Sequence, residues 1–505
     1  MTDNIAANES SALEDIIARK REEVRQLRAA GTDVFPHRLP GPTVFTAQAK
    51  TSQAGTEISC AGRVVQLRLM GKAAFAHIQD TSGKLQLYFK KDTLGEQNYD
   101  FFKKHVHVGD YIFVSGKMFL THTNEITLAA EKMTLLSKAM RPMPEKWHGI
   151  QDTEIRYRMR HLDLLANAEV RDIFILRSKL VSSVRRTLDS KDFLEVETPI
   201  LCASAGGASA TPFETYLRAL KMPLFMRIAT ELYLKRLIIG GLERVYEIGR
   251  VFRNEGLDTR HNPEFTTLEV YQAYTDYNGM MQLLEDIFSG CAAALGKDSV
   301  EYRGVKISLK PPYRRLSLPD AWKEHCGEDI HNILQGKTFN RANLESLAKR
   351  FHIEHGADTP SAKIFDRIFD AKIVPLLEQP VFLMDYPTAI TPLAKLKGGD
   401  PCITERFEFF AAGMEMANAY TELNDPDDQL ERLQEQMRQK QAEHNEEVDV
   451  IDKDFVEAME AGMPPTGGMG IGIDRMAMLF SGNPSIREVI LFPTLKAETA
   501  QQPPA

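Results

Sequence analysis

Residues 244–273 read RVYEIGRVFRNEGLDTRHNPEFTTLEVYQA, and this stretch decides the fold. Apolar and polar residues alternate along 244–253 and again along 264–274, which predicts two β-strands joined by a polar loop. Successive side chains of a strand point to opposite faces of its sheet. One face of the second strand therefore carries Phe265, Thr267, Glu269 and Tyr271. A sheet face with acidic and aromatic side chains is either a solvated outer surface or the floor of a polar ligand site.

A second segment, ERFEFFAAGMEMANAYTEL at 405–423, predicts a β-hairpin. A turn near residues 411–413 would place Glu408 roughly opposite Glu415. Carboxylates that face each other across strands repel, so such a pair generally has a cation between its members or a raised pKa. Oxygen ligands at this spacing suit Mg²⁺, with phosphate oxygens and water completing its shell. An ordinary surface pair produces the same pattern.

A third segment, GGMGIGIDRMAML at 467–479, alternates glycines with apolar residues. It predicts a strand with one face free of side chains, which a ligand or another backbone can approach closely. The spacing is not the G-x-G-x-x-G dinucleotide fingerprint, and the lysine of a P-loop is missing. Arginines are therefore the candidates for holding phosphate groups.

Taken in order, these segments resemble the signature motifs of the class II aminoacyl-tRNA synthetases, and in particular of the bacterial-type lysyl-tRNA synthetases. The first motif is similar to FLEVETPIL at 193–201, where Pro199 lies in a family segment associated with the dimer interface. The second is similar to FRNEG at 252–256 with RHNPEF at 260–265, and the third to GIGIDR at 470–475. The resemblance extends from about residue 55 to about residue 495.

The resemblance implies a reaction. Family members activate an amino acid with ATP, which releases pyrophosphate, and transfer it from the aminoacyl-adenylate to the terminal adenosine of a tRNA, which releases AMP. We therefore expect a homodimer that attaches L-lysine to tRNA(Lys), with ATP as co-substrate and Mg²⁺ as cofactor. Glu408 and Glu415 match the magnesium ligands of the family, in agreement with the facing carboxylates of the hairpin.

Further positions match the ATP site of the family. By this resemblance Arg253 would hold the α-phosphate, Glu255 would meet the adenine amino group, and His261 would lie near the outer phosphates. Phe265 would stack on one face of adenine and Arg475 would cover the other. The expected catalysis is positioning and charge neutralisation, without a protein nucleophile.

The part of the site that would bind the amino acid determines which amino acid is the substrate. A lysine substrate needs its side-chain ammonium paired, because burying an unpaired cation is costly. Glu269 and Glu422 offer two carboxylates with Tyr271 beside them, and the matching family positions contact that ammonium. The other positions that match lysine-binding residues are Gly207, Glu231, Asn418, Tyr420 and Gly472. A ligase for aspartate or asparagine, the main alternative, would need cations or amides instead of these two carboxylates.

Short alternating runs near the N-terminus predict a small closed β-barrel, and the OB-fold is the commonest such barrel that binds nucleic acid. The expected strands are 58–69, 73–79, 84–90, 111–119 and 125–130. Arg68, Phe75 and Gln86 resemble the anticodon-reading set of this subclass, since a ring can stack on a base while a polar side chain reads its edge. A barrel-core position for Phe75 and a solvated position for Arg68 remain open.

The expected fold class is α+β, an OB-fold barrel followed by an antiparallel sheet flanked by helices. We place an N-terminal helix and lead-in at 1–57, the anticodon-binding domain at 58–138, a linker at 139–152 and the catalytic domain at 153–497. A helical insertion is expected within about 315–380, a solvated charged helix at 427–447, and a disordered tail at 498–505.

Composition favours a soluble cytoplasmic protein. Charged residues make up 26% and hydrophobic residues 43%, which excludes a mostly disordered chain. The five cysteines form no C-x-x-C pair, as is typical of a reducing compartment. The opening MTDNIAANESSALED is too acidic for a signal peptide, and charges interrupt the apolar stretches, so no membrane span is expected.

Residues 1–138 carry 18 Lys and Arg against 15 Asp and Glu. This balance fits a polyanion-binding module or unremarkable scatter.

The chain departs from the family pattern near the pocket rim. Thr211 stands where a basic residue is frequent, Lys221 where an acidic one is frequent, and ANAY at 417–420 where GNGF is frequent. These changes bear on loop closure and substrate affinity more than on the reaction. A non-catalytic relative kept for binding, the second alternative, would have lost a phosphate arginine or a magnesium carboxylate. All the charged residues assigned above are present.

Overall fold

The computed structural model describes residues 2–143, 149–204, 206–207, 210–442 and 451–496. The chain divides into two compact units, Met1–Ile150 and Gln151–Ala505. The expected tail at 498–505 and the end of the expected helix at 427–447 lie outside the described residues. None of the described helices combines the length and apolar character that crossing a membrane requires.

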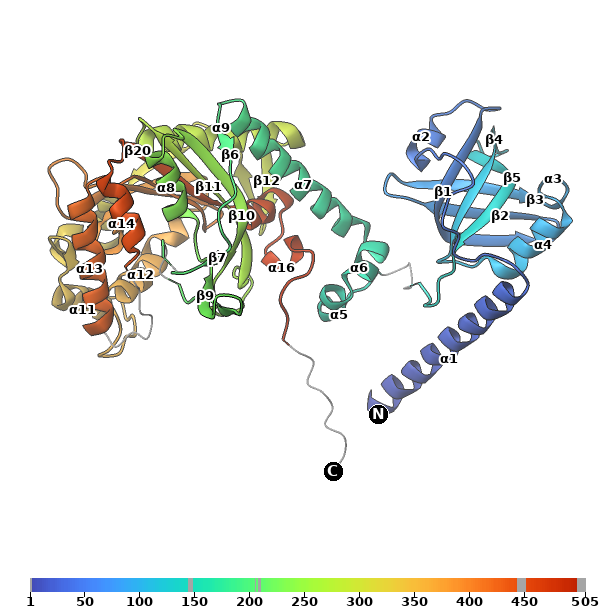
Figure 1. Ribbon diagram of the computed structural model, residues 1–505, viewed down its shortest axis with the longest axis horizontal. Coiled ribbons are helices and arrows are strands. Elements are labelled where there is room, and N and C mark those ends of the chain that lie inside the picture. The colour runs from blue at the N-terminus through green and yellow to red at the C-terminus, as the bar shows by residue number, and fades with distance from the viewer. Residues whose placement is uncertain (1, 144–148, 205, 208–209, 443–450, 497–505) are drawn as a thin grey trace. The chain divides into compact units, whose positions relative to one another are not determined.

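The first unit is built on a five-stranded barrel (Figure 1). Its strands are β1 (Glu57–Met70), β2 (Ala73–Gln79), β3 (Lys84–Lys90), β4 (Tyr111–Leu120) and β5 (Ile126–Ser137). The order β1-β2-β3-β5-β4 closes because β1 pairs with both β2 and β4. Alternate residues such as Ala74, Ala76 and Ile78 are fully buried inside the barrel. The period of two that predicted these strands therefore also separates barrel interior from outer face.

Helices complete this unit: α1 (Thr2–Ala29), α2 (Thr46–Lys50), α3 (Lys91–Leu94) and α4 (Glu96–His105). The alternation pattern did not predict α3 and α4, yet Phe102 of α4 stacks on the barrel residue Phe89 with 4.0 Å between ring centroids. Lys138 is fully buried and lies 3.1 Å from Asp110 and 3.4 Å from Glu23 of α1. This ion-paired cluster ties α1 to the barrel.

An eight-stranded sheet forms the centre of the second unit, in the order β14-β17-β18-β19-β20-β11-β10-β6. The strands are β6 (Leu194–Glu195), β10 (Arg244–Phe252), β11 (Glu264–Ala273), β14 (Arg314–Ser317), β17 (Val381–Pro387), β18 (Ile403–Ala411), β19 (Met414–Thr421) and β20 (Thr466–Gly472). Neighbours are antiparallel except for the end pairs β14–β17 and β6–β10. The glycine-rich β20 lies between β19 and β11, so segments far apart in sequence share one surface.

One face of this sheet packs against helices. The helices of this part of the unit are α5 (Thr153–Arg158), α6 (Arg160–Ala166), α7 (Ala168–Asp189), α9 (Tyr277–Leu295), α15 (Ile473–Ser481) and α16 (Ile486–Val489). Leu268, Phe409 and Met469 point into an apolar core shared with α7, α9 and α15. Because side chains alternate along a strand, Glu269, Asn418 and the β20 glycines lie on the opposite face.

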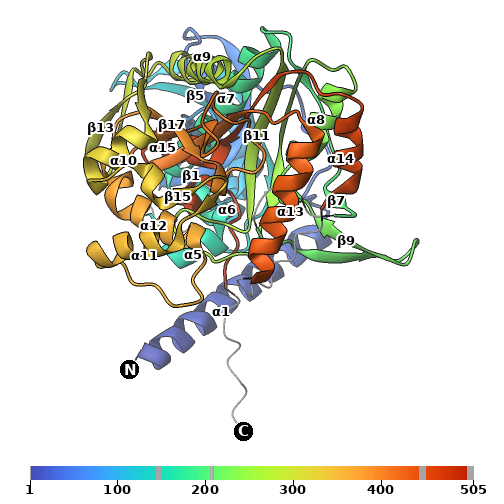
Figure 2. The ribbon, with the colours of Figure 1, turned by 90° about the vertical axis from the view of Figure 1, so that its left-hand side faces the viewer.

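The elements around that opposite face are smaller. They comprise β7 (Leu201–Cys202), β8 (Glu214–Leu217), β9 (Met222–Met226), α8 (Glu231–Ile239), η3 (Thr388–Ile390), α13 (Pro426–Ala442) and α14 (Lys453–Glu460). Figure 2 shows the hairpin that contains β9 projecting from the body of the unit. The charged helix α13 is not fully solvated as expected, since Gln429 and Arg432 are buried and bond to the carbonyls of Pro392 and Ala394.

The segment 315–380 has a core of its own, centred on Trp322 stacked on Phe365. It contains α10 (Leu318–Cys326), η1 (Ile330–Ile333), β15 (Leu334–Gln335), β16 (Thr338–Phe339), α11 (Arg341–Arg350), α12 (Ser361–Lys372) and η2 (Val374–Leu376). A short hairpin of β12 (Ser299–Tyr302) and β13 (Val305–Ser308) precedes it.

Candidate functional site

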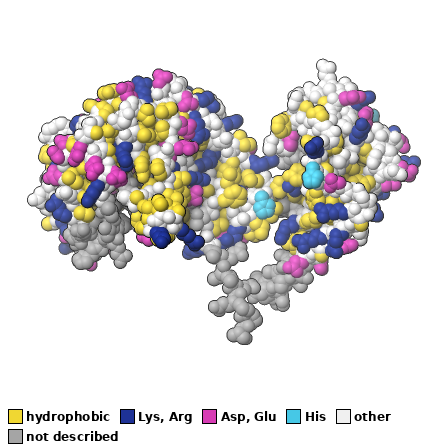
Figure 3. Space-filling view, in the orientation of Figure 1, with side chains coloured by type: hydrophobic (Ala, Val, Ile, Leu, Met, Phe, Trp, Pro, Cys, Tyr) yellow, Lys and Arg dark blue, Asp and Glu magenta, His cyan; other side chains and the backbone are white. Residues whose placement is uncertain are grey.

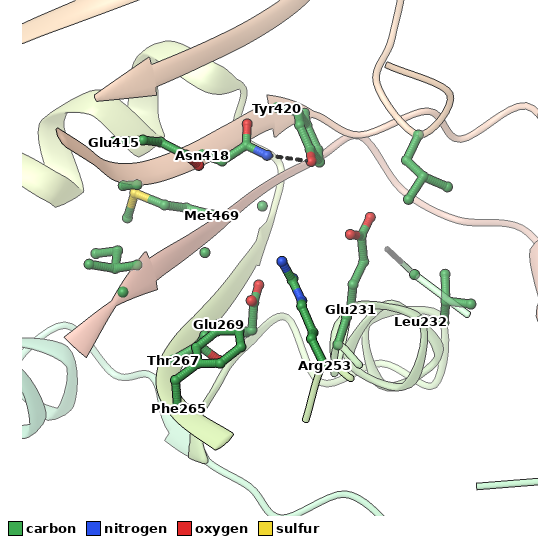
Figure 4. Close-up of a pocket in the computed structure, with 18 of the residues that line it drawn as sticks. Glu231, Leu232, Arg253, Phe265, Thr267, Glu269, Glu415, Asn418, Tyr420 and Met469 are labelled. Carbon is green, nitrogen blue, oxygen red and sulfur yellow. Dashed lines mark hydrogen bonds between the residues drawn. The ribbon is translucent and has the colours of Figure 1, made fainter. Parts of the chain in front are cut away.

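A cavity of about 540 Å³ opens on the free face of the large sheet. Its floor is β11, β19 and β20, and its walls come from α8, the loop after β10, α13 and α14 (Figure 4). The predicted site residues that line it are Gly207, Glu231, Arg253, Glu255, His261, Phe265, Glu269, Tyr271, Glu415, Asn418, Tyr420, Gly472 and Arg475. Glu408 and Glu422 do not line the cavity.

The glycines of β20 make room for the acidic floor. A side chain at Gly470 would place its Cβ 2.8 Å from Glu269 Oε1, and one at Gly468 would collide with Glu422 Oε1 and the Tyr271 ring. In the sheet, Gly470 faces Glu269 on one side and Asn418 on the other. The strand face without side chains, which the sequence predicted, therefore leaves space for neighbouring side chains as well as for a ligand.

At the acidic end of the cavity, positive charge compensates the carboxylates only in part. Burial raises the pKa of Glu269 to about 8, and the nearby Glu231 adds to the shift. Glu422 is only 1% exposed, and burial also raises its pKa, although Lys235 opposes that rise. Its Oε1 has no hydrogen-bond partner among the described residues. A half-buried carboxylate on the cavity lining, next to a buried one with an unpaired oxygen, is suited to receive a cation.

Lys235 is a charged residue of this region that the sequence reasoning missed. Its ammonium lies 2.5 Å from Glu231 Oε1 and contacts Glu422 Oε2. The i, i+4 spacing of Glu231 and Lys235 on α8 is a recognisable sequence signal for the first contact. The second contact, with a residue nearly two hundred positions away, has no local signal.

Asn418 is held in one orientation by two neighbours. Its Nδ2 donates to the Tyr420 hydroxyl at 2.8 Å, as Figure 4 shows, and its Oδ1 accepts from Arg406 Nε at 3.0 Å. Tyr420 is one of the departures from the family pattern noted above, and its hydroxyl gives this chain a bond that phenylalanine could not make. Arg406 lines the cavity and was also missed by the sequence reasoning.

The two hairpin carboxylates are not directly opposed. The register pairs Glu408 with Asn418 and Glu415 with Phe410, because a β-bulge at Phe409–Phe410 shifts the pairing. The prediction that Glu408 lies roughly opposite Glu415 is therefore wrong, because the register of the two strands differs from the expected one. The two carboxylates are nevertheless close enough that burial first, and Glu415 in addition, raises the pKa of Glu408 against the opposing effect of Arg406.

Glu408 is held from two sides. It accepts from Arg406 Nη2 at 2.5 Å and from the Tyr386 hydroxyl at 2.8 Å. Among the described residues no group of three or more His, Cys, Asp and Glu side chains converges as a metal cage. Two carboxylates beside a pocket fit Mg²⁺, which takes one or two protein carboxylates and completes its shell with water and substrate phosphates.

The cavity also carries cationic and aromatic side chains, and Arg253 among them lies near Glu269 (Figure 4). The Arg253 guanidinium lies 5.3 Å from the centroid of the Phe265 ring. Arg475 donates to the backbone carbonyl of Glu415 at 2.6 Å and lies 3.3 Å from its carboxylate. His261 is 2.8 Å from Asp258, within the loop that follows β10. The cavity thus presents two arginines, a histidine and a ring, which suit phosphates and a flat base.

In the barrel, the three predicted anticodon-reading residues lie on the outer face. Arg68 is exposed and pairs in register with Phe75, which alternates with the buried Ala74 and Ala76. Phe75 is therefore not a core residue. Its ring lies 4.9 Å from Tyr88, whose ring lies 5.8 Å from Phe119. This aromatic row crosses three strands, so it could not be identified before their pairing was known.

Gln86 belongs to a polar cluster beside that row. Its Nε2 donates to Glu125 at 2.8 Å, and its Oε1 accepts from Thr127 at 2.8 Å. Glu125 also lies 3.5 Å from His77. Aromatic rings next to ordered polar groups are the combination that binds unstacked bases.

Known proteins share both units. Residues 152–496 match the family described as tRNA synthetases class II (D, K and N), and residues 58–136 match the OB-fold nucleic acid binding domain. A lysine–tRNA ligase of Thermoanaerobacter sp. (strain X514) is 46% identical over 97% of this chain and 97% of its own length. The lysine–tRNA ligase of Moorella thermoacetica (strain ATCC 39073 / JCM 9320) is 47% identical over 95% and 98%, and that of Bacillus cereus (strain G9842) is 45% identical over 96% and 98%.

These matches confirm the resemblance drawn from the three motifs, together with the expected OB-fold and synthetase domains. The synthetase match covers well over half of the chain, and the identity to the relatives extends over nearly its full length. The chain therefore belongs to the class II tRNA synthetases of the D, K and N group, in the branch whose members are named lysine–tRNA ligase.

Proposed function

We propose that this protein attaches L-lysine to tRNA(Lys), through a lysyl-adenylate formed from ATP with release of pyrophosphate and, on transfer, of AMP. The acidic end of the cavity is the observation that supports lysine as the substrate. Glu269 lines it, Glu422 Oε1 and the Tyr271 ring lie next to Gly468, and Glu422 Oε1 has no hydrogen-bond partner among the described residues. An extended side chain that ends in an ammonium group supplies the missing partner.

The proposed chemistry needs no nucleophile from the protein. The carboxylate of lysine attacks the α-phosphorus of ATP, and pyrophosphate leaves. Arg253 would neutralise charge on the α-phosphate, and Phe265 would offer a stacking surface for adenine. Glu231 and Asn418 line the part of the cavity where the amino and carboxylate groups of lysine would lie. Pre-oriented groups of this kind lower the barrier by positioning and electrostatics.

We propose Glu408 and Glu415 as the magnesium ligands. The raised pKa of Glu408, caused by burial and then by Glu415, supports a site in need of positive charge. Bound Mg²⁺ would neutralise phosphate oxygens of ATP. The role of the chain is to keep both carboxylates ionised and fixed, which Arg406 and Tyr386 do for Glu408.

The barrel is proposed as the anticodon-binding domain, covering about residues 58–138, with the catalytic domain at about 153–497. Phe75, Tyr88 and Phe119 would stack on bases, while Gln86 and Arg68 would contact base edges or phosphates. The cytoplasm is the proposed compartment, since the described structure leaves all five cysteines unpaired, as in reducing compartments.

A homodimer is proposed from an apolar surface on the second unit. Leu194, Ile200 and Leu201, in the segment that resembles the dimer-associated motif, are 51%, 45% and 49% exposed. Figure 3 shows hydrophobic side chains gathered over the region of β7 and β9. Contiguous apolar patches on a soluble protein mark interaction surfaces. Sedimentation equilibrium of the purified chain should give twice the monomer mass, and a monomer would contradict the proposal.

ATP–pyrophosphate exchange with each of the twenty amino acids tests the proposed function. Exchange that depends on Mg²⁺ and rises only with lysine is the expected result. Exchange with another amino acid would keep the class II reaction and remove the argument from Glu269 and Glu422. A folded protein without exchange for any amino acid would favour a binding-only role.

A further inference from the structure

Lys235 joins two carboxylates of the proposed substrate site without lining the cavity itself. The residue lies on α8, its side chain is fully buried, and its ammonium contacts both Glu231 and Glu422. Glu231 comes from the same helix, whereas Glu422 follows β19. One buried cation therefore links a wall of the cavity to the buried carboxylate beside Gly468.

The surroundings keep this lysine charged. Burial lowers the pKa of Lys235, but the attraction of Glu231 and Glu422 outweighs it and the pKa lies above its usual value. The only aromatic neighbour with a ring contact among the described residues is Phe455 of α14, whose centroid is 5.9 Å from Nζ. The other charged groups that act on this cluster are Glu269, Arg253 and Glu247, and Glu247 is itself paired with Arg227. Tyr271 and Tyr420 are held neutral, because burial raises the pKa of both hydroxyls.

A charge count shows what the lysine does for the site. Glu231, Glu269 and Glu422 offer three carboxylates, and Lys235 is the cation that contacts two of them. Arg253, which is assigned to the α-phosphate, opposes the rise in the pKa of Glu269, so the site keeps an excess of acidic groups for a bound lysine. Without Lys235 the carboxylate of Glu422 would be buried without a cation, and a buried carboxylate in that position takes up a proton. A protonated Glu422 offers a donor where the substrate ammonium needs an acceptor.

We propose that Lys235 is a positioning residue for the substrate: its ammonium holds Glu231 and Glu422 in place as carboxylates, so that Glu422 Oε1 stays an acceptor for the side-chain ammonium of lysine. The inference rests on the proposed function and adds a residue to it. Lys235 has no contact with the substrate in this arrangement and acts through the two glutamates.

Lys235→Met tests the inference, since it keeps an unbranched apolar chain and removes the charge. In ATP–pyrophosphate exchange we expect the KM for lysine to rise about 100-fold, because breaking a buried ion pair is strongly destabilising. The KM for ATP should change by less than about twofold. Lys138→Met is the matched control, because Lys138 is also fully buried between two carboxylates but lies in the first unit. It should lower the melting temperature and leave both KM values unchanged.

A double variant distinguishes positioning from packing. If Lys235 acts through Glu422 and Glu231, then Lys235→Met and Glu422→Gln together should raise the KM for lysine far less than the product of the two single effects. Multiplied effects, or an unchanged KM for lysine in Lys235→Met, would overturn the inference while leaving the proposed function in place. If Lys235→Met fails to fold, the comparison of the double variant with Glu422→Gln still tests whether Lys235 acts through the glutamates. Absence of lysine-dependent exchange in the unaltered protein would instead remove the proposed function.

Discussion

The outer face of the barrel and the acidic end of the cavity are both candidate recognition surfaces, but they differ in how their polar groups are satisfied. In the barrel, Gln86 already has hydrogen bonds on both ends of its amide, to Glu125 and Thr127. In the cavity, Glu422 Oε1 is buried without a hydrogen-bond partner among the described residues. A ligand at the barrel must exchange existing bonds, whereas a ligand in the cavity supplies a missing one.

This difference predicts how strongly each surface discriminates between ligands. A buried acceptor that only a cation can satisfy discriminates strongly, because an uncharged ligand leaves it unpaired. Half-buried rings such as Phe75 and Tyr88 discriminate weakly among bases, because every base has a face that can stack. Changes in the cavity should therefore have larger effects than changes on the barrel.

Neutralising the acidic floor should have the largest effect. Glu269→Gln is expected to raise the KM for lysine about 10³-fold in ATP–pyrophosphate exchange, because an ammonium would then face an amide instead of a carboxylate. Glu264→Gln is the control, since Glu264 is exposed on the same strand, outside the cavity lining. Equal effects of the two substitutions would show that the position in the cavity does not matter.

The carboxylates proposed for Mg²⁺ come next. Glu408→Gln is expected to raise the Mg²⁺ concentration needed for half-maximal exchange about 100-fold, because it removes an anionic oxygen ligand. A magnesium titration at saturating lysine and ATP measures this shift. An unchanged magnesium requirement with normal exchange would remove Glu408 from the proposed metal site.

Removing a ring from the barrel should have a smaller and separable effect. Phe75→Ala is expected to raise the KM for tRNA about 30-fold, in line with the ~2 kcal/mol of one base–ring stack, and to leave ATP–pyrophosphate exchange unchanged. Phe45→Ala removes a ring that is 61% exposed and outside the row, and serves as the control. Aminoacylation assays with varied tRNA concentration give both values. A loss of exchange in Phe75→Ala would contradict the separation of the two surfaces.

The pH dependence should be the smallest effect. Since burial and then Glu231 raise the pKa of Glu269 to about 8, this group holds a proton below that pH and must lose it when an ammonium binds. The KM for lysine should therefore rise as the pH falls below 8, by up to about tenfold per pH unit. Measurements between pH 6.5 and 8.5 test the slope. The same slope in Glu269→Gln would assign the titration to another group.

The sequence predicted most of the fold because its strands bury alternate residues. Strands β2, β3, β10 and β11 lie within a residue or two of their expected limits, since one face of each is apolar. Helix α13 was misjudged because its charged residues include Arg432, whose buried guanidinium bonds to a backbone carbonyl. Composition alone does not distinguish such an arginine from a solvated one.

The sequence predicted the site residues that lie within one motif. It did not predict contacts between residues that are far apart in the chain. Arg253, Phe265 and Glu269 follow from one continuous stretch, and the structure brings them to one cavity. The pairing of Glu408 with Asn418 depends on a bulge that leaves no mark in the sequence. Lys235 and Arg406 were missed because their partners are set by tertiary packing, which one sequence without its fold does not specify.

The position of β20 has a consequence for how this protein is made. The strand is near the end of the chain but in the middle of the sheet, between β19 and β11. Until the ribosome has released residues 466–472, both neighbouring strands have an unpaired edge, and unpaired edges template aggregation. Chains terminated before Thr466 should therefore accumulate in the insoluble fraction, and synthesis of this enzyme leaves its sheet divided until β20, the last of the sheet's strands in sequence, has been made.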